Sequence, residues 1–457
     1  MQKTVVINVV GLTKRLIGKH TPFMASFLEQ GKLAYIKPVL PAVTCSAQST
    51  YLTGKWPSEH GIVGNGWYFK DECEIKFWRQ SNKLVQQPKI WDTLKKMDSN
   101  FTCANHFWWY NMYSNVDYSL TPRPNYLADG RKIPDVYSYP AELRDQMQAS
   151  LGTFPLFEFW GPRTTINSSK WIADAAIRTD EKHDPTLTFI YLPHLDYNLQ
   201  RHGLNFDVIS KDLNEIDSVV KQLVMHYQKT NANIVLLSEY GITDVNRPVH
   251  LNRILRNEGY INVRVERGLE LLDAGASEAF AVADHQIAHI YIKKQENINQ
   301  IKALLSAVQG VERVLSKNEL EKEHLTHERC GDLVVVADKD SWFTYYFWLD
   351  DAVAPDYARM VDIHKKPGYD PVEMLTDPKD KLVTAKVVTK LIKKKLGFRT
   401  VMDIIPLNAN LIKGSHGRIP EDTEDYPIFI SNMGSLVQKE KMEAVEVYDL
   451  IKDHVLN

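Results

Sequence analysis

A threonine, Thr44, follows an apolar run and precedes a segment dense in hydroxyl residues. Two glycine-centred turns and a final amide, Asn65, complete the stretch 41–65. If Thr44 follows a strand and opens a helix, backbone N–H groups and the helix dipole create an anion site there. A hydroxyl at that point becomes a nucleophile when a base or a metal lowers its pKa. A threonine that caps an ordinary helix gives the same local pattern, so spacing alone leaves both interpretations open.

Carboxylates follow two of the apolar runs that predict buried strands. Asp196 comes shortly after the run 187–193, and Glu239 comes directly after the run 233–238. The carboxyl ends of parallel strands meet at one edge of a sheet, where α/β proteins build their sites. We therefore expect the two acids to converge on one crevice.

The elements that must position these residues alternate between strands and helices. Strands are predicted at 5–10, 33–39, 101–105, 187–193, 233–238 and 427–430, and helices at 22–30, 89–96, 171–180 and 207–227. Apolar residues in the last of these helices recur along one stripe, as in a helix that buries a single face. The alternation predicts an α/β fold with a doubly wound, mostly parallel sheet and helices on both faces.

The pattern changes near residue 249. Helices at 251–258 and 298–308 and strands at 263–265, 286–292, 311–316 and 331–337 predict an inserted α+β cap. We expect the first part of the core domain at 1–248, the cap at 249–347 and the return of the core at 348–457. The segment 107–137 is aromatic and rich in proline without a clear period, which predicts a long loop over the site.

Composition is ordinary for a globular protein, with 44% hydrophobic and 25% charged residues. A formal net charge of −2 gives no whole-chain attraction to nucleic acid or to an anionic membrane. The four cysteines, Cys45, Cys73, Cys103 and Cys330, lack metal-knuckle spacing and are expected to be reduced and buried. No apolar stretch has the length of a signal or membrane segment. We expect a cytoplasmic protein with no nucleic acid polymer and no membrane as partner.

The stretch around Thr44 resembles the nucleophile segment of the alkaline phosphatase superfamily, in its type I phosphodiesterase/nucleotide pyrophosphatase branch. The matching residues are Pro41, Thr44, Thr53, Gly54, Pro57, His60, Gly61, Ile62 and Asn65. The resemblance implies an alkaline phosphatase-like fold with Thr44 as nucleophile and Asn65 as a stabiliser of the oxyanion. It also implies two metal ions roughly 4 Å apart, most often zinc, that activate the nucleophile and polarise the phosphoryl group.

The implied metal ligands are only partly present. Asp196, Glu239 and His416 occupy three of the family's ligand positions. Val10 stands where the family has the first aspartate, Gln200 where it has a histidine four residues after the aspartate, and Tyr240 where it has a second histidine. The remaining two carboxylates and one imidazole suffice for one open metal site but not for the standard pair. We therefore expect a divalent metal, most often zinc, as one or two ions.

Replacement ligands are available elsewhere in the chain. Asp362 and His364 bring a carboxylate and an imidazole into a polar loop, and the neighbouring Lys365 suits a phosphate. An ordinary surface loop would have the same composition. His202, two residues after Gln200, is a further candidate ligand. His285 and His289 are expected to be structural.

Clustered aromatic residues and a loop lysine are candidates for contact with substrate. The candidates are Cys45, Trp67, Tyr68, Trp108, Trp109, Tyr110, Tyr240 and Lys365. The aromatic members would form a wall for an apolar or nucleobase-like leaving group, and the Thr44 and Cys45 amides would help to stabilise the oxyanion. Tyr240 has three interpretations, as a core residue filling the lost histidine site, as a proton donor, or as a sign that the second metal is absent.

Three functional hypotheses follow from these residues. The first is a metal-dependent hydrolase of phosphodiester, pyrophosphate or related phosphoryl substrates, which the intact Thr44 and Asn65 favour. The second is a catalytically altered member that binds a phosphorylated or acidic small molecule, which Val10, Gln200 and Tyr240 favour. The third is a phosphonoacetate hydrolase-like enzyme that cleaves a C–P bond.

Overall fold

The computed structural model describes residues 1–398 and 400–457. The chain forms two compact units. The first comprises residues 1–64, 80–243 and 419–457, and the second comprises residues 65–79 and 244–418. The second unit therefore includes 348–418 and a short N-terminal segment in addition to the span expected for the cap.

The first unit is built on one large sheet, to which the described residues contribute nine strands in the order β23-β2-β22-β11-β1-β10-β5-β6-β9. Their bounds are β1 Thr4–Val9, β2 Lys32–Lys37, β5 Cys103–His106, β6 Tyr118–Pro122, β9 Val136–Tyr139, β10 Leu187–Leu192, β11 Asn233–Leu237, β22 Ile428–Ser431 and β23 Lys441–Glu443. β1 lies in the middle, parallel to β10 on one side and to β11 on the other. β22 is antiparallel to both its neighbours, and β9 is antiparallel to β6.

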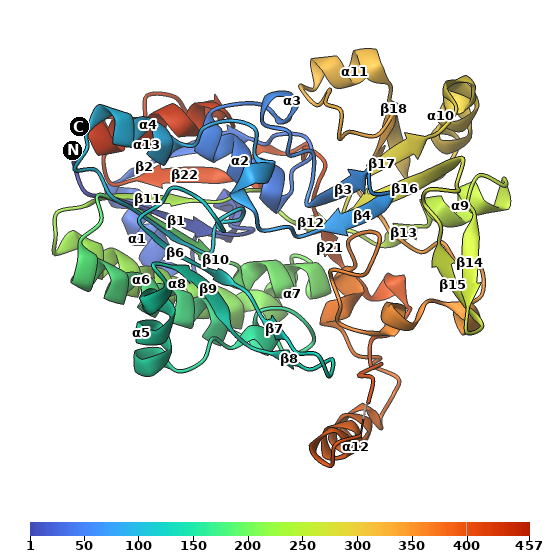
Figure 1. The fold of residues 1–457 in the computed structure, drawn as a ribbon. Coiled ribbons are helices and arrows are strands. Elements are labelled where there is room, and N and C mark those ends of the chain that lie inside the picture. Colours follow the sequence, from blue (N-terminus) through green and yellow to red (C-terminus); the bar gives the residue numbers. More distant parts are fainter. Residues whose placement is uncertain (399) are drawn as a thin grey trace. The chain divides into compact units, whose positions relative to one another are not determined.

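Helices cover both faces of this sheet, as Figure 1 shows, with α2, α4 and α13 on one face and α1, α6 and α8 on the other. The helices of the first unit are α1 Pro22–Gln30, α2 Thr44–Thr53, α3 Pro57–His60, α4 Ile90–Met97, α5 Ala141–Leu151, α6 Asn167–His183, α7 His194–His202, α8 Phe206–Gln228 and α13 Glu446–Leu456. Every residue of β1, β10 and β11 is buried, as expected for strands covered on both sides. The predicted doubly wound, mostly parallel sheet is confirmed.

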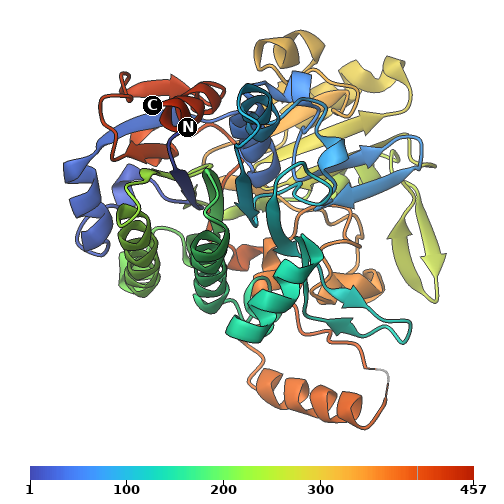
Figure 2. The ribbon, with the colours of Figure 1, turned by 60° about the vertical axis from the view of Figure 1, so that its left-hand side comes forward.

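The two ends of the chain meet at one edge of the first unit. The Gln2 amide donates to the Val455 carbonyl at 2.7 Å, and the N and C marks lie side by side in Figure 2. The Thr4 hydroxyl donates to the His454 carbonyl at 3.0 Å. The first strand and the last helix therefore belong to the same core.

The segment 107–137 differs from its prediction. It supplies the strand β6 and part of β9 to the main sheet, together with the short hairpin β7 Asn125–Tyr126 and β8 Lys132–Ile133. Leu120 and Val136 face the core in these strands. The prolines concealed this pattern, because Pro122 ends β6 and neither strand has the length that makes alternation visible.

The second unit is α+β. Its strands are β3 Gly66–Phe69, β4 Glu74–Phe77, β13 Arg247–Val249, β14 Val263–Glu266, β15 Leu269–Leu272, β16 Ala279–Asp284, β17 Ile287–Ile292, β18 Val311–Leu315, β19 Leu333–Ala337, β20 Ser341–Phe343 and β21 Gly414–Ser415, and β12 Thr243–Asp244 lies at the sequence boundary between the units. Its helices are α9 Leu251–Asn257, α10 Ile298–Ser306, α11 Lys317–Lys322 and α12 Val383–Lys395. β16, β17, β19 and β18 form its largest sheet. Among the helices of the described residues, we find none with the length and apolarity needed to cross a membrane.

Candidate functional site

The predicted site residues of the first unit lie at the carboxyl ends of its central strands. β1 ends before Val10, β10 ends shortly before Asp196, and β11 ends before Glu239 and Tyr240. Thr44 is the first residue of α2, after an extended Val43. The first N–H groups of a helix have no carbonyl partner within it, so α2 begins with donors and a positive dipole end at Thr44.

Tyr240 connects the threonine to one of the acids. The hydroxyl oxygens of Thr44 and Tyr240 lie 3.2 Å apart, and the Tyr240 hydroxyl donates to Asp196 Oδ1 at 3.2 Å. The Gln200 amide donates to Asp196 Oδ2 at 2.8 Å. Both oxygens of Asp196 therefore accept hydrogen bonds from uncharged side chains, and both donors stand where the resemblance expects histidines.

Glu239 is held by two side-chain amides of the first unit. The side-chain amides of Asn8 and Gln48 both donate to Glu239 Oε1. Its second oxygen, Oε2, is buried and receives neither amide. The Trp109 backbone N–H donates to Gln48 Oε1 at 2.6 Å, which fixes the orientation of the Gln48 amide.

Burial governs the titration of both acids. Loss of hydration raises the pKa of Asp196 to about 7, against the lowering effect of the Gln200 and Tyr240 hydrogen bonds. Burial also raises the pKa of Glu239 to about 8, although hydrogen bonds from Gln48, Asn8 and Thr44 lower it. The charge of Asp196 contributes a smaller upward shift to the pKa of Glu239, as expected for neighbouring acids.

Asn8 and Gln48 were not among the residues predicted for the site. A signal existed for each, because Asn8 is a polar residue within an otherwise apolar strand and Gln48 follows Thr44 by four residues on the same face of α2. Neither residue carries a charge or belongs to the motif that the resemblance uses. Their hydrogen bonds to Glu239 depend on the tertiary structure.

Several predicted residues of the first unit lie in the core or at its surface. Val10 and Cys45 are fully buried. Trp108 packs its ring edge-on against Phe189, at 5.0 Å between ring centroids, within the hydrophobic core. Trp109 and Tyr110 are also buried. His202 is the last residue of α7, where loss of hydration and the charge of Arg201 lower the pKa of its ring.

The second unit contains Asn65 and His416. Asn65 donates its backbone N–H and its side-chain amide to the two oxygens of Asp284, at 2.8 and 3.1 Å. The rings of His416 and His285 lie 3.6 Å apart between centroids, and His285 also stacks on Tyr369. Burial and the charge of His416 keep the pKa of His285 well below its usual range. Asp284, which sequence analysis missed, therefore fixes the predicted oxyanion residue.

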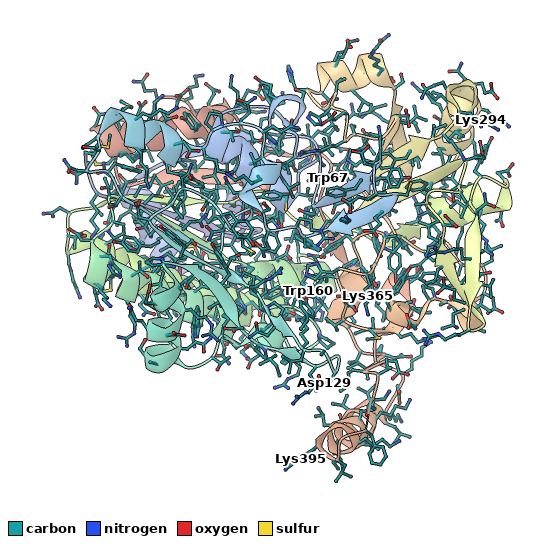
Figure 3. All side chains as sticks on the ribbon, viewed as in Figure 1. Trp67, Asp129, Trp160, Lys294, Lys365 and Lys395 are labelled. Atoms are coloured by element: carbon teal, nitrogen blue, oxygen red, sulfur yellow. The ribbon has the colours of Figure 1, made fainter. Side chains whose placement is uncertain are left out.

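The aromatic candidates of the second unit have separate environments. Trp67 is buried against Phe69, with the Arg329 guanidinium 5.0 Å from its ring centroid. Tyr68 lines a cavity of about 370 Å³ together with Phe280, Tyr291 and Lys293. Figure 3 labels Trp67 and also Lys365, the lysine proposed for phosphate.

The loop that offered replacement ligands is a surface loop within the second unit. Lys365 is 65% exposed and forms an ion pair with Asp362 at 3.2 Å. His364 is exposed, and its Nδ1 lies 3.4 Å from the Phe77 carbonyl oxygen. Cys73, at the turn between β3 and β4, is exposed, so the prediction that all four cysteines are buried is wrong.

The chain matches one known protein family over most of its length. The type I phosphodiesterase/nucleotide pyrophosphatase family matches residues 4–370 of this chain. This chain belongs to that family. The matched range includes Thr44, Asp196 and Glu239, and the family expected from the sequence is confirmed.

Curated relatives of this phosphodiesterase/pyrophosphatase family carry related names. An uncharacterized pyrophosphatase/phosphodiesterase of Schizosaccharomyces pombe is 24% identical over 253 residues, covering 53% of this chain and 44% of the relative. Ectonucleotide pyrophosphatase/phosphodiesterase 1 of Saccharomyces cerevisiae is 25% identical over 272 residues, covering 53% of this chain and 34% of the relative. The chain therefore spans less than half the length of these two relatives. Ectonucleotide pyrophosphatase/phosphodiesterase 2 of the same yeast is 24% identical over 387 residues, covering 74% and 69% of the two chains.

Solved structures establish the fold. Murine ectonucleotide pyrophosphatase/phosphodiesterase 5 in complex with AMP superposes with a TM-score of 0.61 at 16% identity, covering 100% of this chain and 95% of that one. Phosphonoacetate hydrolase from Sinorhizobium meliloti in complex with phosphonoformate gives a TM-score of 0.61 at 13% identity, with coverage of 99% and 96%. The alkaline phosphatase-like α/β fold is confirmed.

The residues of this family member do not fit the two-ion site that the resemblance implies. Val10 cannot ligate a metal, and Gln200 and Tyr240 use their polar groups as hydrogen-bond donors to Asp196. Asp196 therefore lacks the imidazoles that would complete a zinc site beside it. Zinc sites use thiolate, imidazole and carboxylate ligands, usually three or four of them. We therefore derive no catalytic step through a metal pair.

Proposed function

We propose that this protein is a phosphoric ester hydrolase that cleaves a small phosphodiester or pyrophosphate with Thr44 as its nucleophile. One observation carries the proposal, namely that the Thr44 hydroxyl opens α2 and lies 3.2 Å from the hydroxyl of Tyr240. The start of a helix binds the oxygens of a phosphoryl group through its unpaired N–H groups and its dipole. A hydroxyl placed there adjoins the phosphorus atom of a bound ester.

The hydrogen bonds around Thr44 define its part in the reaction. Thr44 Oγ attacks phosphorus, the Oγ–P bond forms, and the bond from phosphorus to the leaving oxygen breaks. The proton of Thr44 leaves along the chain from Thr44 to Tyr240 to Asp196, in which Tyr240 donates to Asp196. Water then attacks phosphorus and the Oγ–P bond breaks, while the proton held on Asp196 returns through Tyr240 to Thr44 Oγ and the phosphoryl product leaves.

The second candidate function is binding of a phosphorylated or acidic small molecule without catalysis. The observation that favours it is the pair Gln200 and Tyr240, which satisfy Asp196 with neutral donors where the family's pattern has imidazoles. A protein of this kind would retain the anion site at the start of α2 and bind a phosphorylated small molecule without turnover.

Substrate assays of Thr44 variants test the first candidate. We expect Thr44→Ala to lose at least about 1,000-fold in turnover of bis(p-nitrophenyl) phosphate, because the nucleophile is gone. Thr44→Ser keeps a hydroxyl and should stay within about 30-fold of the parent. Tyr240→Phe should lower kcat by about 10-fold or more with little change in KM, because it interrupts the proton path.

The same assay separates the alternatives. It is run with EDTA and with added zinc, since a divalent cation is the cofactor expected from the family. AMP esters, pyrophosphates and phosphonoacetate form the substrate panel. Turnover of the panel by Thr44→Ala at the parent rate would refute the nucleophile, and calorimetric binding of AMP without turnover of any substrate would establish the binder.

A further inference from the structure

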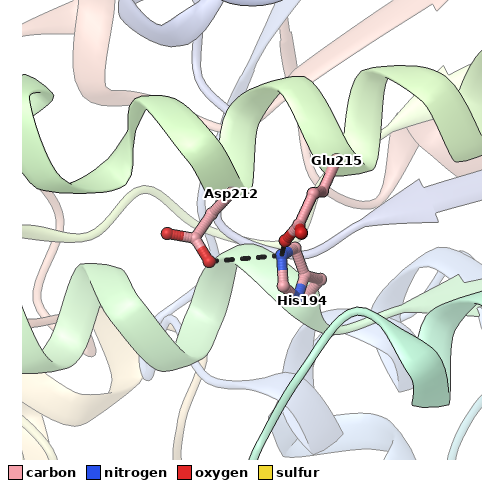
Figure 4. A group of neighbouring side chains, drawn as sticks. All are labelled: His194, Asp212 and Glu215. Atoms are coloured by element: carbon pink, nitrogen blue, oxygen red, sulfur yellow. Dashed lines mark ion pairs between the residues drawn. The ribbon is translucent and has the colours of Figure 1, made fainter.

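A second group of ligand-type side chains lies between α7 and α8, apart from Thr44. His194 is the first residue of α7, and Asp212 and Glu215 lie three residues apart on α8. Residues three apart share a helix face. Figure 4 shows the imidazole pointing between the two carboxylates. Nothing in the motif that identifies the family uses these residues.

The distances within this group suit a metal ion. His194 Nε2 lies 3.3 Å from Asp212 Oδ1 and 3.3 Å from Glu215 Oε2. One ligand atom from each of the three residues falls within 4.8 Å of the others. For metal–ligand distances of about 2.0–2.1 Å, the edge of a tetrahedron is about 3.4 Å. The two measured separations match such an edge.

The imidazole lacks the hydrogen bonds that a buried histidine normally makes. His194 is 3% exposed, and neither of its ring nitrogens has a hydrogen bond of acceptable geometry with a described residue. Buried polar atoms almost always have a hydrogen-bond partner, so the two ring nitrogens of His194 indicate that a ligand binds there.

The surroundings support the same assignment. The Asn198 amide donates to Asp212 Oδ1 at 2.8 Å and so orients that carboxylate. Hydrogen bonds of this kind fix the ligands in protein metal sites. Lys211 Nζ lies 3.7 Å from Glu215 Oε1, and the Lys211 side chain is 81% exposed, so its charge is largely hydrated. The Glu215 side chain is 29% exposed, which leaves a path for an ion and for a water as fourth ligand.

We propose that His194, Asp212 and Glu215 bind one divalent transition-metal ion, with zinc as the preferred ion, and that this ion fastens the start of α7 to α8. One imidazole and two carboxylates favour zinc over magnesium, which prefers oxygen ligands alone. The proposal concerns stability rather than turnover, and it stands whether or not Thr44 is a nucleophile.

Zinc binding to the EDTA-treated full chain tests this site, with calorimetry and native mass spectrometry as readouts. We expect His194→Gln and Glu215→Gln each to lose one bound zinc and at least about 100-fold in affinity. Asp207→Asn, which removes an exposed acid from the same helix, should bind zinc as the parent does. Thr44→Ala should also keep this zinc, which separates the site from the proposed nucleophile.

A second variant distinguishes a ligand from a structural histidine. His194→Cys offers a thiolate and should restore zinc affinity to within about 10-fold of the parent, whereas His194→Gln should not. The unfolding midpoint of the parent should rise with added zinc and that of His194→Gln should not, because an ion that binds only the folded state stabilises it. Equal zinc binding by the parent and His194→Gln, or tighter binding of magnesium than of zinc, would overturn the assignment.

Discussion

Asp196 and His194 stand two residues apart on α7 in opposite chemical situations. Both oxygens of Asp196 accept hydrogen bonds from the neutral donors Gln200 and Tyr240. His194 faces two carboxylates, and its ring has no hydrogen bond among the described residues. The first group lies where the family's pattern expects a metal, and the second lies where no motif points.

The difference shows that a residue at a metal-ligand position of the family's motif does not by itself make a metal site. Neutral donors satisfy a buried carboxylate without supplying a further ligand, so Asp196 remains a single carboxylate where zinc needs three or four ligands. Asp212 also accepts a hydrogen bond, from Asn198, but it lies beside a second carboxylate and an imidazole, which supply two more ligand atoms. The ligand-type side chains that surround an acid therefore decide whether that acid can take part in a metal site.

The largest expected effect comes from restoring ligands at the motif position. We expect the double variant Gln200→His with Tyr240→His to bind zinc at least about 100-fold more tightly at Asp196 than the parent does. Each substitution removes a donor from Asp196 and supplies an imidazole. The measurement is zinc calorimetry in a His194→Gln background, which eliminates the second site.

A matched control separates removal of donors from gain of ligands. Gln200→Leu with Tyr240→Phe frees the same carboxylate but adds no ligand. If this control binds zinc as tightly as the histidine variant does, the neutral donors alone excluded the metal. If neither variant binds zinc, the two positions do not converge on one ion and the comparison fails.

An intermediate effect is expected on the pH dependence of stability. The folded pKa of Glu239, about 8, is raised above its unfolded value, so its favourable contribution is complete at low pH and is lost as pH rises through 8. Glu239→Gln removes this loss. Between pH 5 and pH 9, the free energy of unfolding of this variant should rise by about 3 kcal/mol relative to that of the parent. Urea unfolding in EDTA measures both.

Glu29→Gln provides the comparison for this pH dependence, because Glu29 is exposed on α1 and its substitution removes no buried charge. A constant difference between Glu239→Gln and the parent over the whole pH range would contradict the prediction. Such a result would mean that the Asn8 and Gln48 amides fully replace the hydration of this carboxylate.

The smallest effect is expected at Asn198. Asn198→Ala removes the amide that orients Asp212 but leaves all three proposed ligands in place. We expect zinc affinity at the His194 group to fall by about 10-fold, the lower end of the range for loss of such a hydrogen bond. Calorimetry against the parent measures it. A loss as large as that of His194→Gln would indicate that Asn198 does more than orient the acid.

The main features of the core were predictable because they follow from local patterns. Runs of β-branched apolar residues predicted the central strands, and the helix at 22–30 has the predicted bounds in α1. These signals are strong where an element is long and faces the core along its whole length. The strands β6 and β9 were missed because prolines and aromatic residues interrupt short segments whose pairing is set by distant neighbours.

The sequence by itself determined the family, the α/β fold, and the positions of Thr44, Asp196 and Glu239 at helix and strand ends. These depend on residue order, since a strand that ends beside its neighbours delivers the next residue to a common edge. Tertiary structure alone decided that Gln200 and Tyr240 satisfy Asp196, that Asn8 and Gln48 hold Glu239, and that His194 meets two acids of α8. Hydrogen bonds and ion pairs between distant residues depend on distances within a packed core, which no local pattern specifies.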